Sequence, residues 1–282
     1  MRPPVVRDPA ALDAALAPWR SGGIAFVPTM GNLHDGHLAL VARARELAPR
    51  VVVSIYVNPL QFGPQEDFAA YPRTLEEDRA RLAEVGADLV FAPRDAVMYP
   101  RPLSETTRVH VPGLSEILCG AHRPGHFDGV ATVVARLFNL VRPEHAVFGE
   151  KDYQQLLVIR RMVEDLAIPV RIHGVPTVRE PDGLAMSSRN QYLTPEERAR
   201  APALYRALRA AAEALAQGSE DYERLEAQGR AALEAAGFRV DYFTVRDADD
   251  LAPPAPGRPL VVLAAARLGR ARLIDNLRVD AI

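Results

Sequence analysis

Short apolar runs rich in β-branched residues alternate with helical patterns over the first 175 residues, and this alternation restricts the possible folds most strongly. The runs are too short for helices and are bounded by Gly, Pro or Asn, so strands are predicted at 24–28, 51–57, 87–92, 146–149 and 170–175. Helices are predicted between them, at 36–47, 74–85, 129–141 and 153–166. Such alternation favours right-handed crossovers and a mostly parallel sheet with helices on both faces. We therefore expect an α/β domain over residues 1–176.

The composition of the sequence and its pattern of apolar residues change after Gly183. Two patterns rich in Ala, Glu and Arg predict helices, and two strand-like stretches follow them around a Pro-rich turn. The helices are expected at 195–216 and 221–236, the strands at 239–245 and 260–265, and the turn at 253–257. A smaller α+β domain with antiparallel pairing is therefore predicted over residues 177–282.

Composition and charge exclude several classes of function. A net charge of −2, with acidic and basic residues interspersed, provides no basic field for nucleic acid and no polybasic helix for a membrane surface. Apolar runs stay well short of the roughly 18 residues that span a bilayer, and the first ten residues lack the apolar stretch of a signal peptide, so a cytoplasmic location is expected. The single cysteine, Cys119, excludes an intramolecular disulfide and fits a packed small residue better than a nucleophile. The expected partners are small molecules.

The use of basic residues is unusual. Of the 34 basic residues, 33 are arginine, and the only lysine is Lys151. Arginine serves most surface and ion-pair roles, whereas the compact ammonium of lysine fits a tight phosphate site as a point charge. The alternative is that this single lysine has no function and remains by chance in a sequence that favours arginine. We predict instead that the lysine at this position is functional.

The first predicted strand ends in a motif that leads directly into a helix, Pro28-Thr-Met-Gly-Asn-Leu-His34-Asp-Gly-His37. A phosphate at this point would meet backbone N–H groups and the positive end of the helix dipole, and glycines would let the backbone approach it closely. Two imidazoles three residues apart can donate hydrogen bonds to a phosphate as charge develops on it. A zinc pair is disfavoured, because the i, i+4 spacing and a nearby third ligand are missing. Walker A and G-x-G-x-x-G signatures are also missing from the sequence.

Polar residues follow two further strands. Gln61, after the second strand, can present its amide to a carboxylate or hydroxyl, although for Gln61 in isolation a surface turn is the better explanation. The fourth strand leads into Gly149-Glu150-Lys151-Asp152 at the start of a helix, where the ammonium can neutralise phosphate oxygens. Asp152 can bind a ribose hydroxyl or cap the helix. One turn later, Gln155 is expected to project towards the same site.

A stretch of two hydroxyls and a guanidinium lies near the predicted domain boundary, in Met186-Ser-Ser-Arg189. This composition suits a phosphate, and a mobile loop there can close over a nucleotide and exclude water. By itself, a turn of this kind is usually the N-cap of a helix. The interpretation as a phosphate site therefore depends on the other motifs.

Together these motifs resemble the pantothenate synthetase family over nearly the whole chain. The resemblance includes 127–134 and Asp275-Asn-Leu277 near the end, besides the segments already quoted. The His-x-Gly-His and Met-Ser-Ser-Arg segments also resemble the two signatures of the wider nucleotidyltransferase superfamily. There the second signature usually carries a lysine, where this chain has Ser188-Arg189, so the role of that lysine is in doubt here and Lys151 can cover it.

The resemblance implies a fold and a reaction. It implies a homodimer of chains with a Rossmann-like N-terminal domain and a smaller C-terminal one. The implied reaction joins pantoate and β-alanine, using ATP and Mg²⁺, through a pantoyl-adenylate, with release of AMP and pyrophosphate. The rival hypotheses are an adenylyltransferase that stops at nucleotide transfer and a nucleotide-binding regulatory module without catalysis.

The resemblance also implies roles for individual residues. His34, His37 and Lys151 would be catalytic, and Gln61 and Gln155 would hold pantoate, with Gln61 also approaching β-alanine. The residues implied for ATP are Met30, Gly31, Asn32, Leu33, His34, Asp35, Gly36, His37, Gly149, Glu150, Lys151, Asp152, Val178, Met186, Ser187, Ser188 and Arg189. The ligands of Mg²⁺ are not identified by the sequence.

Overall fold

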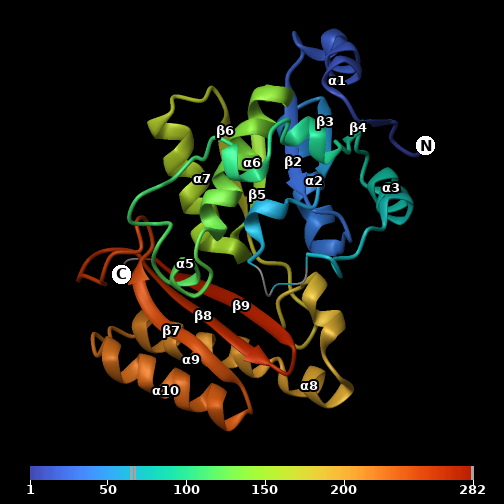
Figure 1. Cartoon of the computed structure of the whole chain (residues 1–282). Coiled ribbons are helices and arrows are strands. Elements are labelled where there is room, and N and C mark those ends of the chain that lie inside the picture. Colours follow the sequence, from blue (N-terminus) through green and yellow to red (C-terminus); the bar gives the residue numbers. More distant parts are fainter. Residues whose placement is uncertain (64–65, 67, 281–282) are drawn as a thin grey trace. The chain divides into compact units, whose positions relative to one another are not determined.

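The structure, a computed structural model, describes residues 1–63, 66 and 68–280. These residues separate into two compact units, which Figure 1 shows as labelled ribbons. Unit 1 contains 1–150 and 158–176, and unit 2 contains 151–157 and 177–282. In the part of the chain described, no helix is long and apolar enough to cross a membrane. The division into independently folding domains at residue 176 stays a prediction.

Unit 1 is built on a parallel sheet, which confirms the predicted α/β fold. Within the described residues the sheet has six strands in the order β1-β4-β3-β2-β5-β6, each parallel to its neighbours. The strands are β1 (Val5–Val6), β2 (Ile24–Thr29), β3 (Arg50–Ile55), β4 (Leu89–Phe91), β5 (His145–Gly149) and β6 (Arg171–Val175). From β2 the chain builds outward through β3 and β4, and it then returns to β5 on the other side of β2. The boundary between β2 and β5 is thus a topological switch point, where open α/β sheets bind ligands beyond the carboxyl ends of their strands.

Helices cover this sheet on both faces because successive strand residues point in opposite directions. Ala25 and Val27 of β2 pack in one apolar cluster with Val41 of helix α2, whereas Phe26 meets Phe138 of helix α6 at a ring distance of 6.3 Å. The helices that carry unit 1 are α1 (Pro9–Leu16), α2 (Asp35–Leu47), α3 (Leu75–Glu84), α4 (Asp95–Met98), α5 (Cys119–His122), α6 (His126–Val141) and α7 (Tyr153–Asp165). The first turns of α7, up to Leu157, belong to unit 2.

One local expectation about helix α3 is wrong. The Thr-x-x-Glu spacing at 74–77 predicts a capping box, but the side chain of Thr74 does not cap the helix. Its hydroxyl instead donates to the carboxylate of Asp78 over 3.2 Å. The buried carboxylate is the stronger acceptor, and it draws the hydroxyl away from the helix start.

Unit 2 packs helices on an antiparallel sheet, as predicted. The described part has strands β7 (Arg239–Asp247), β8 (Leu260–Leu268) and β9 (Ala271–Val279) in that order, with helices α8 (Pro195–Arg200), α9 (Ala203–Ala216) and α10 (Tyr222–Ala235). The single helix expected at 195–216 is wrong, because Pro202 interrupts it between α8 and α9. Strand β9 escaped prediction, since buried Asp275 and Asn276 break its apolar alternation.

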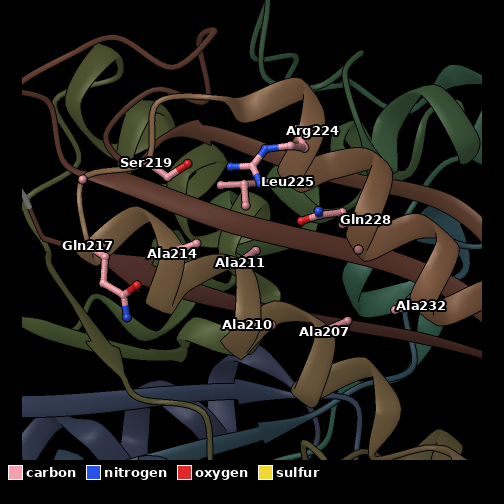
Figure 2. Close-up of a pocket in the computed structure, with 12 residues that line it drawn as sticks. Ala207, Ala210, Ala211, Ala214, Gln217, Ser219, Arg224, Leu225, Gln228 and Ala232 are labelled. Carbon is pink, nitrogen blue, oxygen red and sulfur yellow. The ribbon is translucent and has the colours of Figure 1, made fainter.

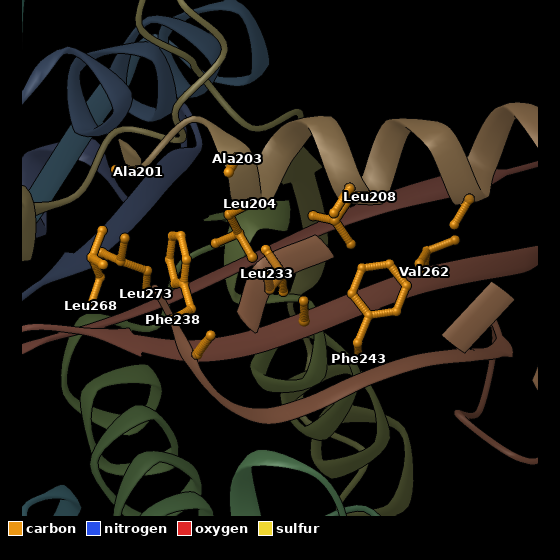
Figure 3. Packing of buried hydrophobic residues seen from close by; sticks show 14 of the residues in the cluster. Ala201, Ala203, Leu204, Leu208, Leu233, Phe238, Phe243, Val262, Leu268 and Leu273 are labelled. Carbon is orange, nitrogen blue, oxygen red and sulfur yellow. The ribbon is translucent and has the colours of Figure 1, made fainter. Parts of the chain in front are cut away.

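The core of unit 2 lies between its helices and its sheet. Figure 3 shows Leu204 and Leu208 of α9 beside Phe243 of β7 and Val262 of β8. Helix α10 contributes Leu233, which is fully buried. Leu184, which lies between the predicted site residues Val178 and Met186, is buried in the same cluster.

Candidate functional site

The loop after β2 has almost all of its backbone N–H groups already occupied. Gly31 and Asn32 both have positive φ, 81° and 51°, which turns successive N–H groups inward. The N–H of Gly31 donates to Thr29 Oγ1, and those of Asn32 and Leu33 donate to the two oxygens of Asp78 at 3.0 and 2.8 Å. The N–H groups of Gly31, Asn32 and Leu33, which precede the helix, are therefore not available to a phosphate. A threonine hydroxyl and a protein carboxylate hold them instead.

His34 and His37 lie side by side where helix α2 begins. His34 is the N-cap residue and His37 occupies the third helical position, with ring centroids 4.1 Å apart. The backbone N–H of His34 donates to Nδ1 of His37 over 3.2 Å. Since Nδ1 is an acceptor, the neutral ring of His37 carries its proton on Nε2. The hydrogen bond from the His34 amide therefore fixes the tautomer of the neutral His37 ring, with Nε2 as its donor nitrogen.

The amide of Gln61, in the short helix η2 (Pro59–Gln61), has a defined orientation. Asn58 Nδ2 donates to Gln61 Oε1 over 3.1 Å, and Gln61 Nε2 contacts Met30 Sδ at 3.0 Å. Asn58 is itself buried and fixed, because the Tyr99 hydroxyl donates to its Oδ1 over 2.6 Å and its Nδ2 also donates to the carbonyl of Gly129. Gln61 consequently presents its NH₂ group, a donor, beside the loop after β2.

The backbone of Gln61 is held from the other side by residues that the sequence did not single out. His126 Nδ1 lies 2.8 Å and Arg123 Nη2 lies 3.3 Å from the Gln61 carbonyl. Arg123 also makes a bidentate pair with Glu66 at 2.6 and 2.7 Å. Burial alone raises the pKa of Glu66, but the hydrogen bonds from Arg123 outweigh it and keep that pKa below its usual value. The carboxylate is therefore ionised and keeps Arg123 in place.

Gly149 is the last residue of β5, the strand next to β2 across the switch point, and Glu150 follows it. A Cβ added at Gly149 would make an ordinary van der Waals contact with Leu40 of α2 at 4.0 Å, so close packing does not require glycine at this position. These two residues, the segment 30–37 and Gln61 all belong to unit 1. Unit 1 thus gathers the predicted residues that follow β2, β3 and β5 at the carboxyl edge of one sheet.

Lys151, Asp152 and Gln155 belong to unit 2. The side chain of Lys151 is one-fifth exposed, and its ammonium lies 3.9 Å from the carboxylate of Asp152. Asn276 of β9 donates from Nδ2 to the Lys151 carbonyl over 2.9 Å, which ties the lysine backbone to the antiparallel sheet. Gln155, half-buried, follows in the first turn of α7.

The remaining predicted residues form a hairpin and a short helix in unit 2. The N–H of Met186 donates to the Val178 carbonyl over 3.0 Å, and that of Gly183 closes the turn onto Glu180, so Val178 and Met186 are neighbours. Gly183, with φ of 91°, lies so close to Tyr205 that an added Cβ would be 2.3 Å from its ring. The turn needs glycine for this close approach.

Ser187 caps the helix η5 (Ser188–Tyr192), because its Oγ accepts the N–H of Arg189 over 3.2 Å. The capping alternative for this turn is therefore correct. It does not exclude a ligand, because the hydroxyl proton of a capping serine stays available as a donor. Ser188 and Arg189 are half-buried in the same helix.

A buried ion pair supports the hairpin. Arg179 donates to both oxygens of Asp275 at 2.6 and 2.9 Å, and its guanidinium lies 4.0 Å from the Tyr205 ring centroid. Burial raises the pKa of Asp275, while Arg179 and, more weakly, Lys151 act in the opposite direction. Asp275 and its neighbour Asn276 therefore link the hairpin to Lys151 within unit 2.

The described part of the structure has a cavity that is lined by some of the predicted site residues and a larger groove that is lined by none of them. A cavity of about 240 Å³ in unit 1 includes Met30 and Gly31 together with the guanidinium-bearing Arg7 and Arg73. A larger groove of about 560 Å³ lies between α9 and α10, and Figure 2 shows that small side chains such as that of Ala211 line it. None of the predicted site residues is among the described residues that line this groove, so its size does not make it the functional site.

Metal binding by protein side chains alone is not supported. Among the described residues, no group of three or more His, Cys, Asp or Glu side chains could hold a metal ion. Cys119 is buried and makes no disulfide in the described chain, as expected from its being the single cysteine.

Comparisons with known proteins agree over nearly the whole chain. The family described as pantoate–β-alanine ligase matches residues 4–278. The pantothenate synthetase of Thioalkalivibrio sulfidiphilus is 63% identical over 98% of this chain and 97% of its own length. That of Methylococcus capsulatus is 60% identical, with 98% of both chains covered.

Two solved structures resemble the chain closely. The pantothenate synthetase from Thermus thermophilus has a TM-score of 0.91 and 55% identity, covering 98% of this chain and 99% of that one. The pantoate–β-alanine ligase from Francisella tularensis, solved with beta-gamma ATP and β-alanine, has a TM-score of 0.81 and 31% identity, covering 98% of this chain and 97% of that one.

Proposed function

The chain belongs to the pantoate–β-alanine ligase family, that of the pantothenate synthetases, and from this premise we propose that it makes pantothenate through a pantoyl-adenylate. ATP is the co-substrate, and AMP and pyrophosphate are the other products. The observation that carries the proposal is the His34–His37 pair at the start of α2, with the proton of the neutral His37 ring directed to Nε2. The Francisella tularensis relative, solved with beta-gamma ATP and β-alanine, supports the choice of substrates.

The first step activates the pantoate carboxylate. A carboxylate is a poor acyl donor because its leaving group would be oxide, so a carboxylate oxygen attacks the α-phosphorus and the bond to pyrophosphate breaks. Charge grows on the phosphoryl oxygens, and the imidazoles of His34 and His37 donate to them. Each well-aimed donor contributes about 3 kcal/mol to such a transition state. The N–H groups of the first helical turn assist, since those of the preceding loop are taken up by Asp78.

Pantoate is held by glutamine amides in this proposal. Because Asn58 occupies Gln61 Oε1, Gln61 offers donors, which suit the carboxylate or hydroxyl oxygens of the acid. Gln155 of unit 2 is the second amide. Residues 30–37, which span the loop after β2 and the start of α2, line ATP from unit 1 together with residues 149–150.

Unit 2 supplies the remaining groups for the triphosphate. Lys151 neutralises phosphate oxygens, and the Ser187 and Ser188 hydroxyls and Arg189 donate to them. Asp152, Val178 and Met186 complete the nucleotide site. The joint action of residues from both units is part of the proposal.

The second step transfers the acyl group. The neutral amine of β-alanine attacks the acyl carbon, a C–N bond forms, and the bond to AMP breaks, while the proton lost by the amine passes to the departing phosphate group or to solvent. Positioning of the two reactants can supply much of the rate, so a strong base is not required. His37 stays a donor throughout, because its Nδ1 is occupied by the His34 amide.

Mg²⁺ enters the proposal only with ATP. The described residues offer no cluster of three or more metal-ligating side chains, and Mg²⁺ in phosphoryl-transfer sites is commonly held by phosphates with one or two carboxylates. Neither step of the proposed reaction is routed through the ion. The homodimer and the cytoplasmic location also stay predictions.

A partial-reaction assay tests the proposal. With ATP and pantoate alone, the protein should release pyrophosphate in a burst of about one equivalent, and AMP release should require β-alanine. Repeated pyrophosphate release without any release of AMP, even when β-alanine is present, would favour an adenylyltransferase that stops at nucleotide transfer. ATP binding without any pyrophosphate release would favour a regulatory module.

A further inference from the structure

Helix α3 holds the loop after β2 through an acid and a base one turn apart. Asp78, 2% exposed, accepts the N–H groups of Asn32 and Leu33, and the Thr74 hydroxyl is its third donor. Arg81, three residues later, donates to the Leu33 carbonyl over 2.8 Å and to the carboxylate of Asp35. Both the donors and an acceptor of the loop are thus fixed by one helix.

The carboxylate of Asp78 occupies the position that an anion would take. Successive N–H groups turned inward by positive φ form a concave nest that binds anions, and here Gly31 and Asn32 have that conformation. The fit is tight, since an added Cβ on Gly31 would lie 3.0 Å from Asp78 Oδ2. A phosphate is therefore kept out of the nest and directed to the first turn of α2.

We infer that Asp78 and Arg81 are positioning residues that hold the Gly31–Asp35 loop so that His34 and His37 meet the α-phosphate. Neither side chain needs to touch a substrate. Both act through the backbone that ends in the His34 N-cap, whose N–H fixes the His37 tautomer. This inference rests on the proposed function of the two histidines.

A purely structural role is the alternative, and the chain offers a matched carboxylate to separate the two. Asp88 also accepts a backbone N–H, that of Val51 over 2.8 Å, and pairs with Arg45 and Arg50. It anchors the amino-terminal end of β3, whereas Asp78 anchors the loop beyond the carboxyl end of β2. Loss of either carboxylate should destabilise the fold, but only loss of Asp78 should disturb the histidines.

The test compares Asp78→Asn with Asp88→Asn in the full-length protein. Asparagine keeps the size of the side chain but turns an NH₂ group towards a loop N–H, so one hydrogen bond is lost. Single-turnover pyrophosphate release with ATP and pantoate should slow by about 10- to 100-fold for Asp78→Asn, because misplacement of reacting groups by about 1 Å costs that much. It should change less than about twofold for Asp88→Asn. Equal rates in the two variants would overturn the inference.

A second pair of variants tests the inference if the Asp78→Asn protein does not fold. Arg81→Gln removes the donors to the loop, and Arg79→Gln is its control, since Arg79 on the same helix donates to the Pro3 carbonyl and Glu76. Slower adenylation by Arg81→Gln than by Arg79→Gln supports the inference, and equal rates contradict it.

Nitrogen chemical shifts of His37 give a readout without substrate. In Asp78→Asn the chemical shift of His37 Nδ1 should move away from the value of a nitrogen that accepts a hydrogen bond, whereas in Asp88→Asn it should stay the same. An unchanged shift in Asp78→Asn would overturn the inference. Because this measurement needs no turnover, it separates failure of the positioning role from failure of the proposed reaction, which would show as absent pyrophosphate release in the unmodified protein.

Discussion

Replacement of Gly129 by alanine should move the glutamine that is proposed to hold pantoate. Gly129 lies in the first turn of α6, directly against the backbone of η2. A Cβ at this position would lie 2.2 Å from the Leu60 carbonyl oxygen and 2.7 Å from the Gln61 nitrogen. These are backbone atoms, so the overlap cannot be relieved by a change of side-chain rotamer.

The size of the shift follows from these distances. Ordinary van der Waals contact begins at 3.4 Å, so the Leu60 carbonyl must retreat by about 1.2 Å. A displacement of about 1 Å at a substrate-positioning group costs about 100-fold in rate, which corresponds to about 2.7 kcal/mol of transition-state stabilisation. Stability should change less, because overpacking costs about 1–3 kcal/mol and alanine returns about 1 kcal/mol of helix propensity.

Steady-state kinetics with varied pantoate would measure this effect, with thermal unfolding as the stability readout. Gly129→Ala should lower kcat/KM for pantoate by about 100-fold and leave KM for ATP within about threefold. Gly229→Ala is the control, since its Cβ would overlap the Phe243 ring in the core of unit 2 at 2.3 Å. That variant should lose stability without a selective loss for pantoate. Equal kcat/KM for pantoate in Gly129→Ala and the unmodified protein would refute the proposed role of the η2 backbone.

Three further outcomes are expected. Lys151→Arg should lower turnover by about tenfold or more with the fold intact, because a planar guanidinium does not replace a compact ammonium; near-normal turnover would contradict the role of the lysine. His37→Gln should retain more adenylate formation than His37→Asn, because only the longer amide can reach the position of Nε2, and the reverse order would contradict the tautomer derived from the His34 amide. The hydrogen bond with Asp128, helped by the charge of Glu116, raises the pKa of His110 above its usual 6.5. The protonated ring therefore stabilises the fold fully below about pH 6.5, and this contribution is lost as the pH rises through the raised pKa. The difference in Tm between the unmodified protein and His110→Gln should accordingly be larger at about pH 6 than at about pH 9, and a pH-independent difference would exclude this origin.

The elements of the fold were largely predictable because their patterns are local. All five strands expected in the first 175 residues exist within a few residues of their predicted ends. The errors have specific causes, such as Pro202, which divides one expected helix, and the buried Asp275–Asn276 pair, which conceals β9. A polar residue on an inward-facing position looks like an exposed one when only periodicity is considered.

The candidate site was predictable in its motifs but not in its supporting contacts. The His-x-Gly-His segment, Gln61 and Lys151 stand out because they follow predicted strands or are rare in the chain. Asp78 gave a weaker signal, since it shares the inward face of α3 with Leu75 and Leu82 at helical spacing, where a charge is unexpected. Most acidic residues on a helix face solvent, so this signal was not distinctive enough.

The sequence by itself determined the order of strands and helices and the chemical groups that follow each strand, because both depend on residues that are close together in the chain. Only the tertiary structure decided how those groups are occupied. The nest of loop N–H groups is filled by a carboxylate 45 residues further along the chain, and the Gln61 amide is oriented by a chain of contacts that starts at Tyr99. Hydrogen-bond partners of this kind are determined by the packing of elements that are distant in the sequence, so local sequence patterns do not predict them.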